Sequence, residues 1–429
     1  MRYLQSLPAV LRTLLTITIL FSACILYGHG HFYRDPGSVF FDESRAYGRW
    51  YTAFRENQAA ALITEVEAQG ALLGENADNM GFTKARYNAS MCATFLTVRR
   101  DVEKQYLETS LGSFLAGLTQ PERRDVNVQI FFANTEPTQH TTYNKPWLRH
   151  LVDRVYSYTD ILPAEEVPSF HALETAGKTV LSKAPLDYAH ALQQCYDTTA
   201  SPYIALFEDD IIAADGWFAR SLWAARETAR HTEQEGKAGK WVYVRTFNQE
   251  RSTGWSSKHI GGNHELPISL AIGSTLYVIL CLLRSKTHPH VDRASAFVIS
   301  FIAIPAFVVL FFQSGKASLL PPAPGVRPES FGCCNQALVF NREHIPGLVG
   351  YMRQWAEKGV HDMLIRDWAW EQGLQRYSAY PMLAQHVGAR SSIQRSAGES
   401  KKVWSMAFET LNPRRLAREH AKTVRSLYG

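Results

Sequence analysis

Three consecutive acidic residues, Glu208, Asp209 and Asp210, follow directly on the apolar run 202–207. A short apolar run of this kind predicts a strand buried on both faces, with the carboxylates at its carboxyl end. Ligands bind at that end of open α/β sheets. Adjacent carboxylates repel one another unless a cation lies among them, and Mg²⁺ or Mn²⁺ prefers such oxygen ligands. The triplet therefore predicts a divalent-cation site, and a solvated turn after a strand is the simpler alternative.

The candidate metal ligands are Asp210, Glu208 and His386. Alternate residues of an extended backbone share a face, so Glu208 and Asp210 can point the same way, and Asp210 is the favoured single ligand. His386 is the candidate third ligand, because imidazole binds manganese and Gly388 lets the backbone turn tightly after it. An ordinary buried or surface histidine is the alternative reading of His386.

The segments around the triplet alternate between predicted strands and helices. The strands are expected at residues 92–98, 126–133, 151–158, 241–247 and 336–340, and the helices at 102–118, 182–195, 217–231, 344–358 and 362–373. This alternation predicts an α/β fold with a parallel sheet built from right-handed crossovers. Residues 42–70 predict a helix that is either a stem or a packed cover, and the proline-rich stretch 319–328 is predicted to be irregular.

Residues near the predicted strand ends are candidates for contact with a nucleotide. Thr97, Val98 and Arg99 end the first strand, and Lys183, Asp187 and Tyr188 lie on the helix that precedes the acidic strand. Lys183 can pair with a phosphate, and a solvated lysine at the start of a helix is the alternative.

Three apolar segments, at residues 7–28, 266–283 and 294–312, are long enough to span a bilayer. The short loop 284–293 between the last two is basic, and so is the N-terminus, so the positive-inside rule places both in the cytosol. The regions 30–265 and 314–429 then lie on the far, lumenal side. A cleaved signal peptide is the alternative for the first segment, although no clear cleavage site follows it.

The composition of the 429-residue chain limits its partners and its redox chemistry. Hydrophobic residues make up 46%, enough for a sizeable core, and the net charge of +5 is spread without a basic stripe, which argues against a nucleic-acid partner. Six cysteines are too few for a disulfide scaffold. Four of them fall on the predicted oxidising side, Cys92, Cys195, Cys333 and Cys334, together with a glycosylation sequon at Asn88. The C-terminal tail from Lys401 is basic and is expected either to contact a membrane or partner or to form a solvated helix.

These motifs together resemble the post-GPI-attachment-to-proteins N-acetylgalactosaminyltransferase family of the Golgi membrane. The resemblance rests on Glu208-Asp209-Asp210-Ile211, the pair of spans between Trp255 and Cys333, Cys333-Cys334-Asn335-Gln336-Ala337, and Gln385-His386-Val387-Gly388 with Ser391-Ser392. It implies a GT-A-like glycosyltransferase domain, interrupted by a two-helix transmembrane hairpin and preceded by a transmembrane anchor. It also implies transfer of a β-linked N-acetylgalactosamine to a mannose of the GPI glycan.

The resemblance further assigns expected roles to residues. Asp210 and His386 would hold Mn²⁺ (or Mg²⁺), with Glu208 and Asp209 beside them, and a UDP-sugar would be the donor. The acceptor would be a GPI-anchored protein in the membrane. Asp362 would be the general base of an inverting displacement, and Asp367 competes for that role. Five residues separate them, about 140° around a helix, so both cannot face one acceptor.

The expected organisation follows from these assignments. Residues 1–28 form a cytosolic tip and a transmembrane anchor, and residues 29–89 form a lumenal stem or helical region. The GT-A domain is expected in two parts, 90–265 with the donor and metal site and 314–429 with the acceptor side, the base and the basic tail, and the transmembrane hairpin 266–313 separates them. Cys92 and Cys195 are expected on neighbouring elements and are predicted to pair, and the resemblance suggests a Cys333–Cys334 bond.

Two other functions remain open at this point. The Glu-Asp-Asp and Gln-His-Val-Gly motifs also resemble N-glycan-branching N-acetylglucosaminyltransferases. A lumenal scaffold or lectin-like protein that lost its chemistry is the alternative from another class. The sequence does not distinguish galactose, N-acetylgalactosamine and N-acetylglucosamine as donor sugars.

Overall fold

The computed structural model describes residues 8–73, 83–100, 105–176, 179–250, 254–255, 264–283, 291–329, 335–388 and 403–429. The chain divides into two compact units, one formed by Met1–Gly48 with Gln249–Pro322 and the other by Arg49–Asn248 with Ala323–Gly429. The second unit therefore consists of two stretches of chain that are separated in sequence by part of the first.

The first unit contains three helices that are long and apolar enough to cross a membrane, Ala9–His31, Glu265–Leu282 and Arg293–Gln313. The predicted spans are thus present, and the chain is a membrane protein. The helices in the described part of this unit are α2 (Ala9–His31), α3 (Glu43–Ala46), α12 (Glu265–Leu282), α14 (Arg293–Val298), the π-helix η5 (Ile299–Ala303), α15 (Ile304–Gln313) and α16 (Lys316–Leu319). Helix α12 packs closely on η5, since a Cβ at Gly273 would lie 2.3 Å from the carbonyl oxygen of Ser300.

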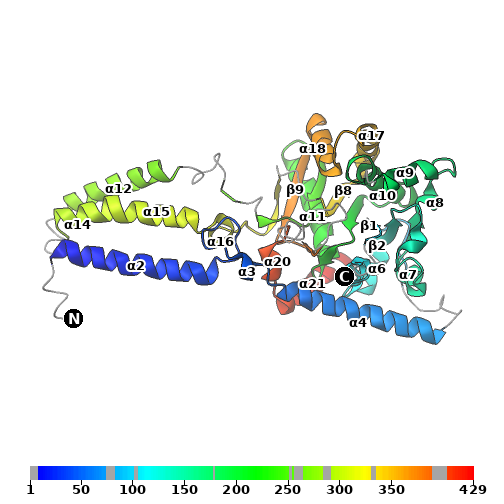
Figure 1. Cartoon of the computed structure of the whole chain (residues 1–429), viewed down its shortest axis with the longest axis horizontal. Helices are drawn as coiled ribbons and strands as arrows, with labels where there is room; N and C mark the ends of the chain where they lie inside the picture. The colour runs from blue at the N-terminus through cyan, green and yellow to red at the C-terminus, as the bar shows by residue number, and fades with distance from the viewer. Residues whose placement is uncertain are drawn as a thin grey trace. The chain divides into compact units, whose positions relative to one another are not determined.

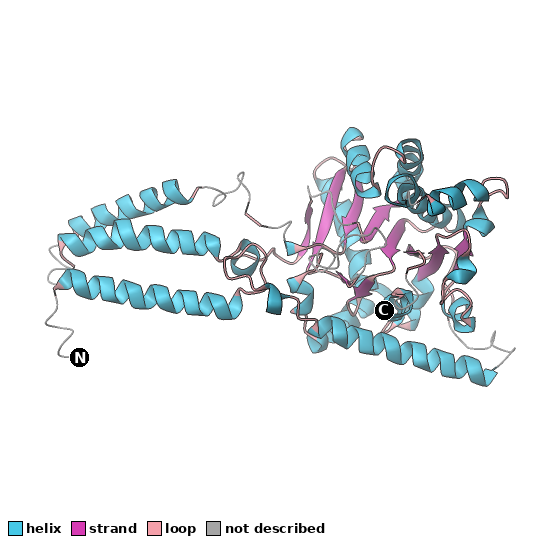
Figure 2. Cartoon of the chain, viewed as in Figure 1, coloured by secondary structure: helices cyan, strands magenta, loops and turns pink. Residues whose placement is uncertain are grey.

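The second unit is built on a mostly parallel sheet flanked by helices (Figures 1 and 2). The sheet has eight strands in the order β3-β2-β1-β4-β8-β6-β9-β7. Strands β1 to β4 are parallel to one another, β6 and β9 are parallel to each other, and β8 and β7 run antiparallel to their neighbours. The strands are β1 (Met91–Thr97), β2 (Val126–Phe132), β3 (Arg154–Ser157), β4 (Tyr203–Glu208), β6 (Trp241–Arg245), β7 (Gly325–Pro328), β8 (Ala337–Asn341) and β9 (Gln375–Tyr380). The predicted α/β class and mostly parallel sheet are confirmed.

Helices cover both faces of this sheet and create two hydrophobic cores. One core includes apolar side chains of α4 (Trp50–Leu73), α5 (Leu107–Leu115), α7 (Pro146–Leu151) and α11 (Trp217–Gln234). The other includes those of α9 (Val167–Thr175), α10 (Ala184–Thr198), α17 (Ile345–Trp355) and α18 (His361–Glu371). The remaining helical elements are α6 (Gln120–Asp125), η2 (Pro137–Gln139), α8 (Tyr158–Ile161), η3 (Thr179–Lys183), η6 (Arg342–His344), α20 (Met406–Glu409) and α21 (Pro413–Tyr428). Burial on both faces explains the unbroken apolar runs of the central strands.

In three segments the structure either differs from the prediction or chooses between two predicted alternatives. Helix α4 is a packed cover, because Tyr51, Ala59 and Val66 are fully buried. The proline-rich stretch 319–328 is not irregular throughout, because it ends in β7. This strand lies at the edge of the sheet, where a proline is tolerated because its missing N–H faces away from the neighbouring strand. The C-terminal helix α21 is not simply solvated, because it buries Leu416 and His420.

A short ribbon of β5 (Ile211–Ala213) and β10 (Ala384–His386) lies directly after the acidic triplet, with Ile211 opposite His386. The predicted Cys92–Cys195 disulfide is present and joins β1 to α10, with a Cα–Cα distance of 5.8 Å. Cys333 and Cys334 lie outside the described residues, as do Ser391, Ser392 and the greater part of the loop 284–293.

Candidate active site

The acidic triplet lies where β4 ends. Glu208 is the last residue of that strand, and Asp209 and Asp210 form the turn into β5. The strand is buried, and both turn residues are nearly inaccessible, with Asp209 2% and Asp210 4% exposed. Because β1, β2 and β4 are parallel, their carboxyl ends meet at this edge, as the sequence predicted.

Asp210 and His386 are brought together by the β5–β10 ribbon. The backbone N–H of Val387 donates to the carbonyl oxygen of Asp210 at 2.8 Å, and His386 Nε2 lies 3.5 Å from Asp210 Oδ2. His386 Nδ1 lies 3.0 Å from the carbonyl oxygen of Val403, so that nitrogen is the donor and Nε2 faces the carboxylate. A Cβ at Gly388 would lie 2.4 Å from Asp210 Oδ2 and 2.8 Å from His386 Nε2, which is why glycine is required there.

A cation of the protein lies on the same carboxylates. The Arg100 guanidinium contacts Asp209 Oδ1 at 2.5 Å and Asp210 Oδ2 at 3.0 Å. The Thr97 hydroxyl donates to the other Asp209 oxygen at 2.6 Å, and Arg100 lies 5.0 Å from the centre of the Tyr106 ring. Asp209 is thus bound by side chains of β1 and of the segment that follows it.

Glu208 faces a different group. The Tyr188 hydroxyl donates to Glu208, and the imidazole of His361 stacks on the Tyr188 ring with 4.1 Å between the centroids. His361 Nε2 lies 3.9 Å from Glu208 Oε1 and 3.0 Å from Asp362 Oδ1. Asp362 lies in the first turn of α18, where the helix dipole stabilises an anion. The structure therefore brings the candidate base Asp362 to the acidic triplet through His361.

Asp367, the competing base, is placed elsewhere on α18. Its side chain is 44% exposed and pairs with Arg366, with 2.6 Å between Arg366 Nη2 and Asp367 Oδ1. An exposed ion pair of this kind is typical of a helix surface.

The candidate donor-binding residues divide into exposed and buried groups. Arg99 is exposed, and its side chain donates to Gln139, while Val98 packs at the margin of a core. Lys183 is only 2% exposed, and its ammonium group donates to Asp187 at 2.9 Å and to the carbonyl oxygen of Ala133 at 2.6 Å. Lys183 is therefore neither solvated nor directed at the acidic triplet in this structure. Asp187 also accepts a hydrogen bond from Tyr158.

Burial and neighbouring charges shift the pKa values of the three acids in different directions. Burial, with the charge of Asp210, raises the pKa of Glu208 to about 7. Burial also raises the pKa of Asp209, although Arg100 opposes this. At Asp210 burial acts in the same direction, but Arg100 and His386 outweigh it and hold its pKa below the ordinary value. Asp210 is thus the member of the triplet that stays ionised most readily.

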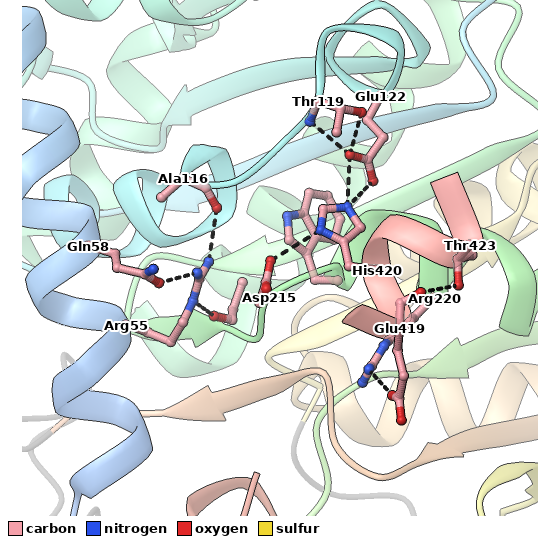
Figure 3. Close-up of polar contacts among 12 residues, drawn as sticks. Arg55, Gln58, Ala116, Thr119, Glu122, Asp215, Arg220, Glu419, His420 and Thr423 are labelled. Atoms are coloured by element: carbon pink, nitrogen blue, oxygen red, sulfur yellow. Dashed lines mark hydrogen bonds and ion pairs between the residues drawn. The ribbon is translucent and has the colours of Figure 1, made fainter. Parts of the chain in front are cut away.

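A second cluster lies at the other end of β5 and supports it (Figure 3). His420 of α21 lies between two acids, with Nε2 2.9 Å from Glu122 Oε1 and Nδ1 3.3 Å from Asp215 Oδ1. Arg55 of α4 donates to the carbonyl oxygen of Ala213 at 2.9 Å and to that of Ala116 at 3.1 Å. We call Glu122, Asp215 and His420 the His420 cluster.

Among the described residues, no three His, Cys, Asp or Glu side chains lie close enough to hold a metal ion together. Two of the predicted ligands, Asp210 and His386, nevertheless suit one. Asp210 Oδ1 is buried and has no hydrogen-bond partner among the described residues, and His386 Nε2 faces the same carboxylate. The contacts of Glu208 instead lie with Tyr188 and His361. The residues therefore fit a cation held by two protein ligands, with further oxygens supplied by a bound substrate.

Two residues of this site were not predicted from the sequence. The sequence indicated Arg99 as a site residue, but Arg100 is the one that contacts the acids. Side chains alternate along an extended chain, so only one of the two adjacent arginines can face them. His361 carries no motif of its own, and its adjacency to Asp362 was the only available signal.

A mostly parallel sheet with buried acids at its strand ends, and a carboxylate at a nearby helix start, suits an α/β enzyme that binds its substrate at this edge. The apolar helices make it a membrane-bound one. The sequence model of the family described as GPI-N-acetylgalactosamine transferase PGAP4 matches residues 91–385, more than half of the chain. The chain belongs to this family and is a GPI-glycan glycosyltransferase. No curated protein matches the chain in the corresponding comparison.

This membership decides between the functions that the motifs had left open. It favours a GPI-glycan transferase over an N-glycan-branching enzyme and over an inactive scaffold. The matched segment contains the acidic triplet and Asp362 and ends one residue before His386.

Proposed function

We propose that this protein transfers N-acetylgalactosamine, or a related hexose, from a UDP-sugar to a mannose of the GPI glycan. The proposed reaction is a single inverting displacement that depends on Mn²⁺ or Mg²⁺. The observation that carries the proposal is the buried Asp210 beside His386. Asp210 Oδ1 has no partner among the residues that the structure describes, and Asp362 is linked to Glu208 of the same triplet through His361.

Asp210 and His386 are the proposed metal ligands, and a bound divalent cation would neutralise the diphosphate leaving group as a Lewis acid. Thr97 and Arg100 hold Asp209 in place and so fix the turn that presents Asp210. Thr97, Val98 and Arg99, at the end of β1, remain the proposed contacts for the nucleotide. Lys183, Asp187 and Tyr188 support that side of the site, the first two through their mutual ion pair and Tyr188 through Glu208.

Asp362 is the proposed general base. It accepts the proton of the acceptor hydroxyl while the bond from that oxygen to the sugar C1 forms and the bond from C1 to UDP breaks. His361 Nε2 lies 3.0 Å from its carboxylate, and the helix start stabilises the anion. Asp367 is less suited to the role because it is exposed and paired with Arg366.

The decisive experiment is a donor panel with the purified full-length protein in detergent and a GPI-glycan acceptor. We expect transfer from one UDP-N-acetylhexosamine or UDP-hexose, loss of transfer in EDTA, and restoration by Mn²⁺. Asp210→Asn should abolish transfer by the protein that remains folded, a fraction that thermal unfolding in detergent measures. Undiminished activity of Asp210→Asn, or in EDTA, would refute the metal assignment.

The proposed location is the Golgi membrane, with the catalytic unit on the lumenal side. Asn88 is exposed and is part of a sequon, and a buried disulfide suits an oxidising compartment. A tag inserted in the loop 284–293 should be digested by protease added to intact Golgi vesicles, while Asn88 should carry a glycan. A protected tag would contradict the proposed topology.

A further inference from the structure

Arg100 occupies an unusual position for an arginine near a proposed metal site. Its guanidinium bridges two carboxylates, at 2.5 Å from Asp209 Oδ1 and 3.0 Å from Asp210 Oδ2, and its side chain is only 9% exposed. The charge of Arg100 is the main favourable influence that offsets burial at both acids. The acidic triplet therefore already holds a positive charge of the protein's own.

Arg100 and a divalent cation use the same carboxylate. Asp210 Oδ2 contacts Arg100, Asp210 Oδ1 has no hydrogen-bond partner among the described residues, and His386 Nε2 lies 3.5 Å from Oδ2. A cation bound between Asp210 and His386 would lie a few ångströms from the guanidinium, and like charges that are buried repel each other strongly. Each cation therefore weakens the contact of the other with Asp210.

We propose that Arg100 is a built-in competitor for the metal site, which compensates Asp210 in the metal-free enzyme and releases it when the divalent cation binds. This inference rests on the proposed metal dependence and goes beyond it. The divalent cation would bind Asp210 in place of Arg100. The affinity of the site for the metal therefore depends partly on the free energy needed to separate Arg100 from Asp210.

The competition has a consequence for the order of binding. A guanidinium that leaves Asp210 needs another acceptor, and the diphosphate of the donor matches its paired N–H groups. The donor would then favour metal binding in two ways, by its own oxygens and by receiving Arg100. Metal and donor would thereby bind cooperatively, and the coupling would be the same whichever binds first.

The test measures Mn²⁺ affinity directly, by electron paramagnetic resonance of free Mn²⁺, with full-length protein in detergent at pH 7.5. Arg100→Gln keeps a polar group of similar length but removes the competing charge. We expect it to bind Mn²⁺ about tenfold or more tightly than the wild type without UDP, which corresponds to one hydrogen bond between charged groups. We also expect UDP to raise the Mn²⁺ affinity of the wild type by a larger factor than that of Arg100→Gln.

Arg230→Gln is the matched control, since it removes the same charge from an exposed arginine of α11 whose partner is Glu227. It should change the Mn²⁺ affinity about twofold at most, because solvent screens that charge. If Arg100→Gln fails to fold, Arg100→Lys serves instead: a point charge cannot bridge both acids in the same way, so Mn²⁺ should still bind several-fold more tightly.

The outcomes separate this inference from the proposed function. Tighter Mn²⁺ binding in the Arg100 variant, with unchanged binding in the Arg230 variant, supports the competition. Wild-type binding of Mn²⁺ with equal or weaker binding in both Arg100 variants overturns the competition and leaves the metal assignment intact. No Mn²⁺ binding to the wild type, even with UDP, overturns both.

Discussion

The acidic triplet and the His420 cluster lie at the two ends of the same short strand, β5, and both contain buried acids with a cation. In the His420 cluster, Glu122 accepts from the Thr119 N–H and hydroxyl at 2.8 Å and faces His420 at 2.9 Å. In the triplet, one buried oxygen of Asp210 has no hydrogen-bond partner in the described part of the chain, and the pKa of Glu208 is raised to about 7.

This difference separates a structural cluster from a reactive one. Charges that are fully paired stabilise the packing of α21 and α6 around β5, whereas incompletely compensated acids are the kind of group that binds a cation or moves a proton. Substitutions in the two clusters should therefore affect different quantities, reaction rate in one and stability in the other.

The largest expected effect is on the rate and concerns Asp362. Asp362→Asn removes the proposed proton acceptor but keeps the shape of the side chain and its place at the start of α18. We expect transfer to fall about 10²–10⁴-fold, the usual share of general base catalysis, with little change in UDP affinity or unfolding temperature. Single-turnover rates and UDP titrations of the same preparations measure both.

Asp367→Asn is the matched control on the same helix. Its carboxylate is exposed and paired with Arg366, so transfer should fall less than about threefold, in keeping with the small worth of surface ion pairs. If Asp367→Asn is the inactive variant, the base is Asp367, and if neither matters, the single-displacement mechanism fails.

Much of this comparison was accessible from the sequence, because its signals are local. An apolar run followed by three acids predicted a strand and its functional end, and the long apolar segments predicted the membrane helices. The placement of Cys92 and Cys195 on adjacent elements was also correct.

The parts that were missed depend on distant residues or on a one-residue register. Glu122 and His420 are 298 residues apart, and neither belongs to a motif, so nothing local indicated that they pair. The choice between Arg99 and Arg100 depends on which of two adjacent side chains turns toward the sheet edge. The antiparallel pairing of β8 with β4 and β6 likewise joins segments that the membrane helices separate in sequence, and residues 337–341 alone do not indicate it.

The next expected effect is on stability and concerns Glu122. Glu122→Gln removes the charge facing His420 and leaves a buried donor against it, so we expect a loss of about 3–5 kcal/mol, as for breaking a buried ion pair. Thermal unfolding in detergent measures this loss, while transfer by the folded protein should change far less than in Asp362→Asn. Glu419→Gln, which breaks the more exposed Arg220–Glu419 pair, should cost below about 1 kcal/mol.

The loss in Glu122→Gln should depend on pH in a defined window. Hydrogen bonds to Asp215 and Glu122 raise the pKa of His420 to about 9, above its unfolded value of about 6.5. A raised pKa contributes stability that is full below the unfolded value and is lost as pH rises through the folded one. The difference between wild type and variant should therefore be largest near pH 6 and shrink toward pH 9. A difference that is constant with pH would show that His420 does not carry the effect.

The smallest expected effect is a gain in stability, and it concerns a glutamate-to-glutamine substitution in the acidic triplet, at Glu208. Burial, then the charge of Asp210, raises the pKa of Glu208 to about 7, above its unfolded value of about 4.3. The stability from protonated Glu208 is therefore full below about pH 4 and lost as pH rises to 7, where the buried carboxylate becomes unfavourable.

Glu208→Gln mimics the protonated form and keeps an acceptor for the Tyr188 hydroxyl. In the metal-free enzyme it should be neutral near pH 5 and stabilising by about 1–2 kcal/mol at pH 8, less than the full shift because the side chain is 24% exposed. Unfolding temperatures in EDTA at the two pH values test this. A lower unfolding temperature at pH 8 would mean that the triplet, like the His420 cluster, is stabilised by its charges, and the distinction between the two clusters would fail.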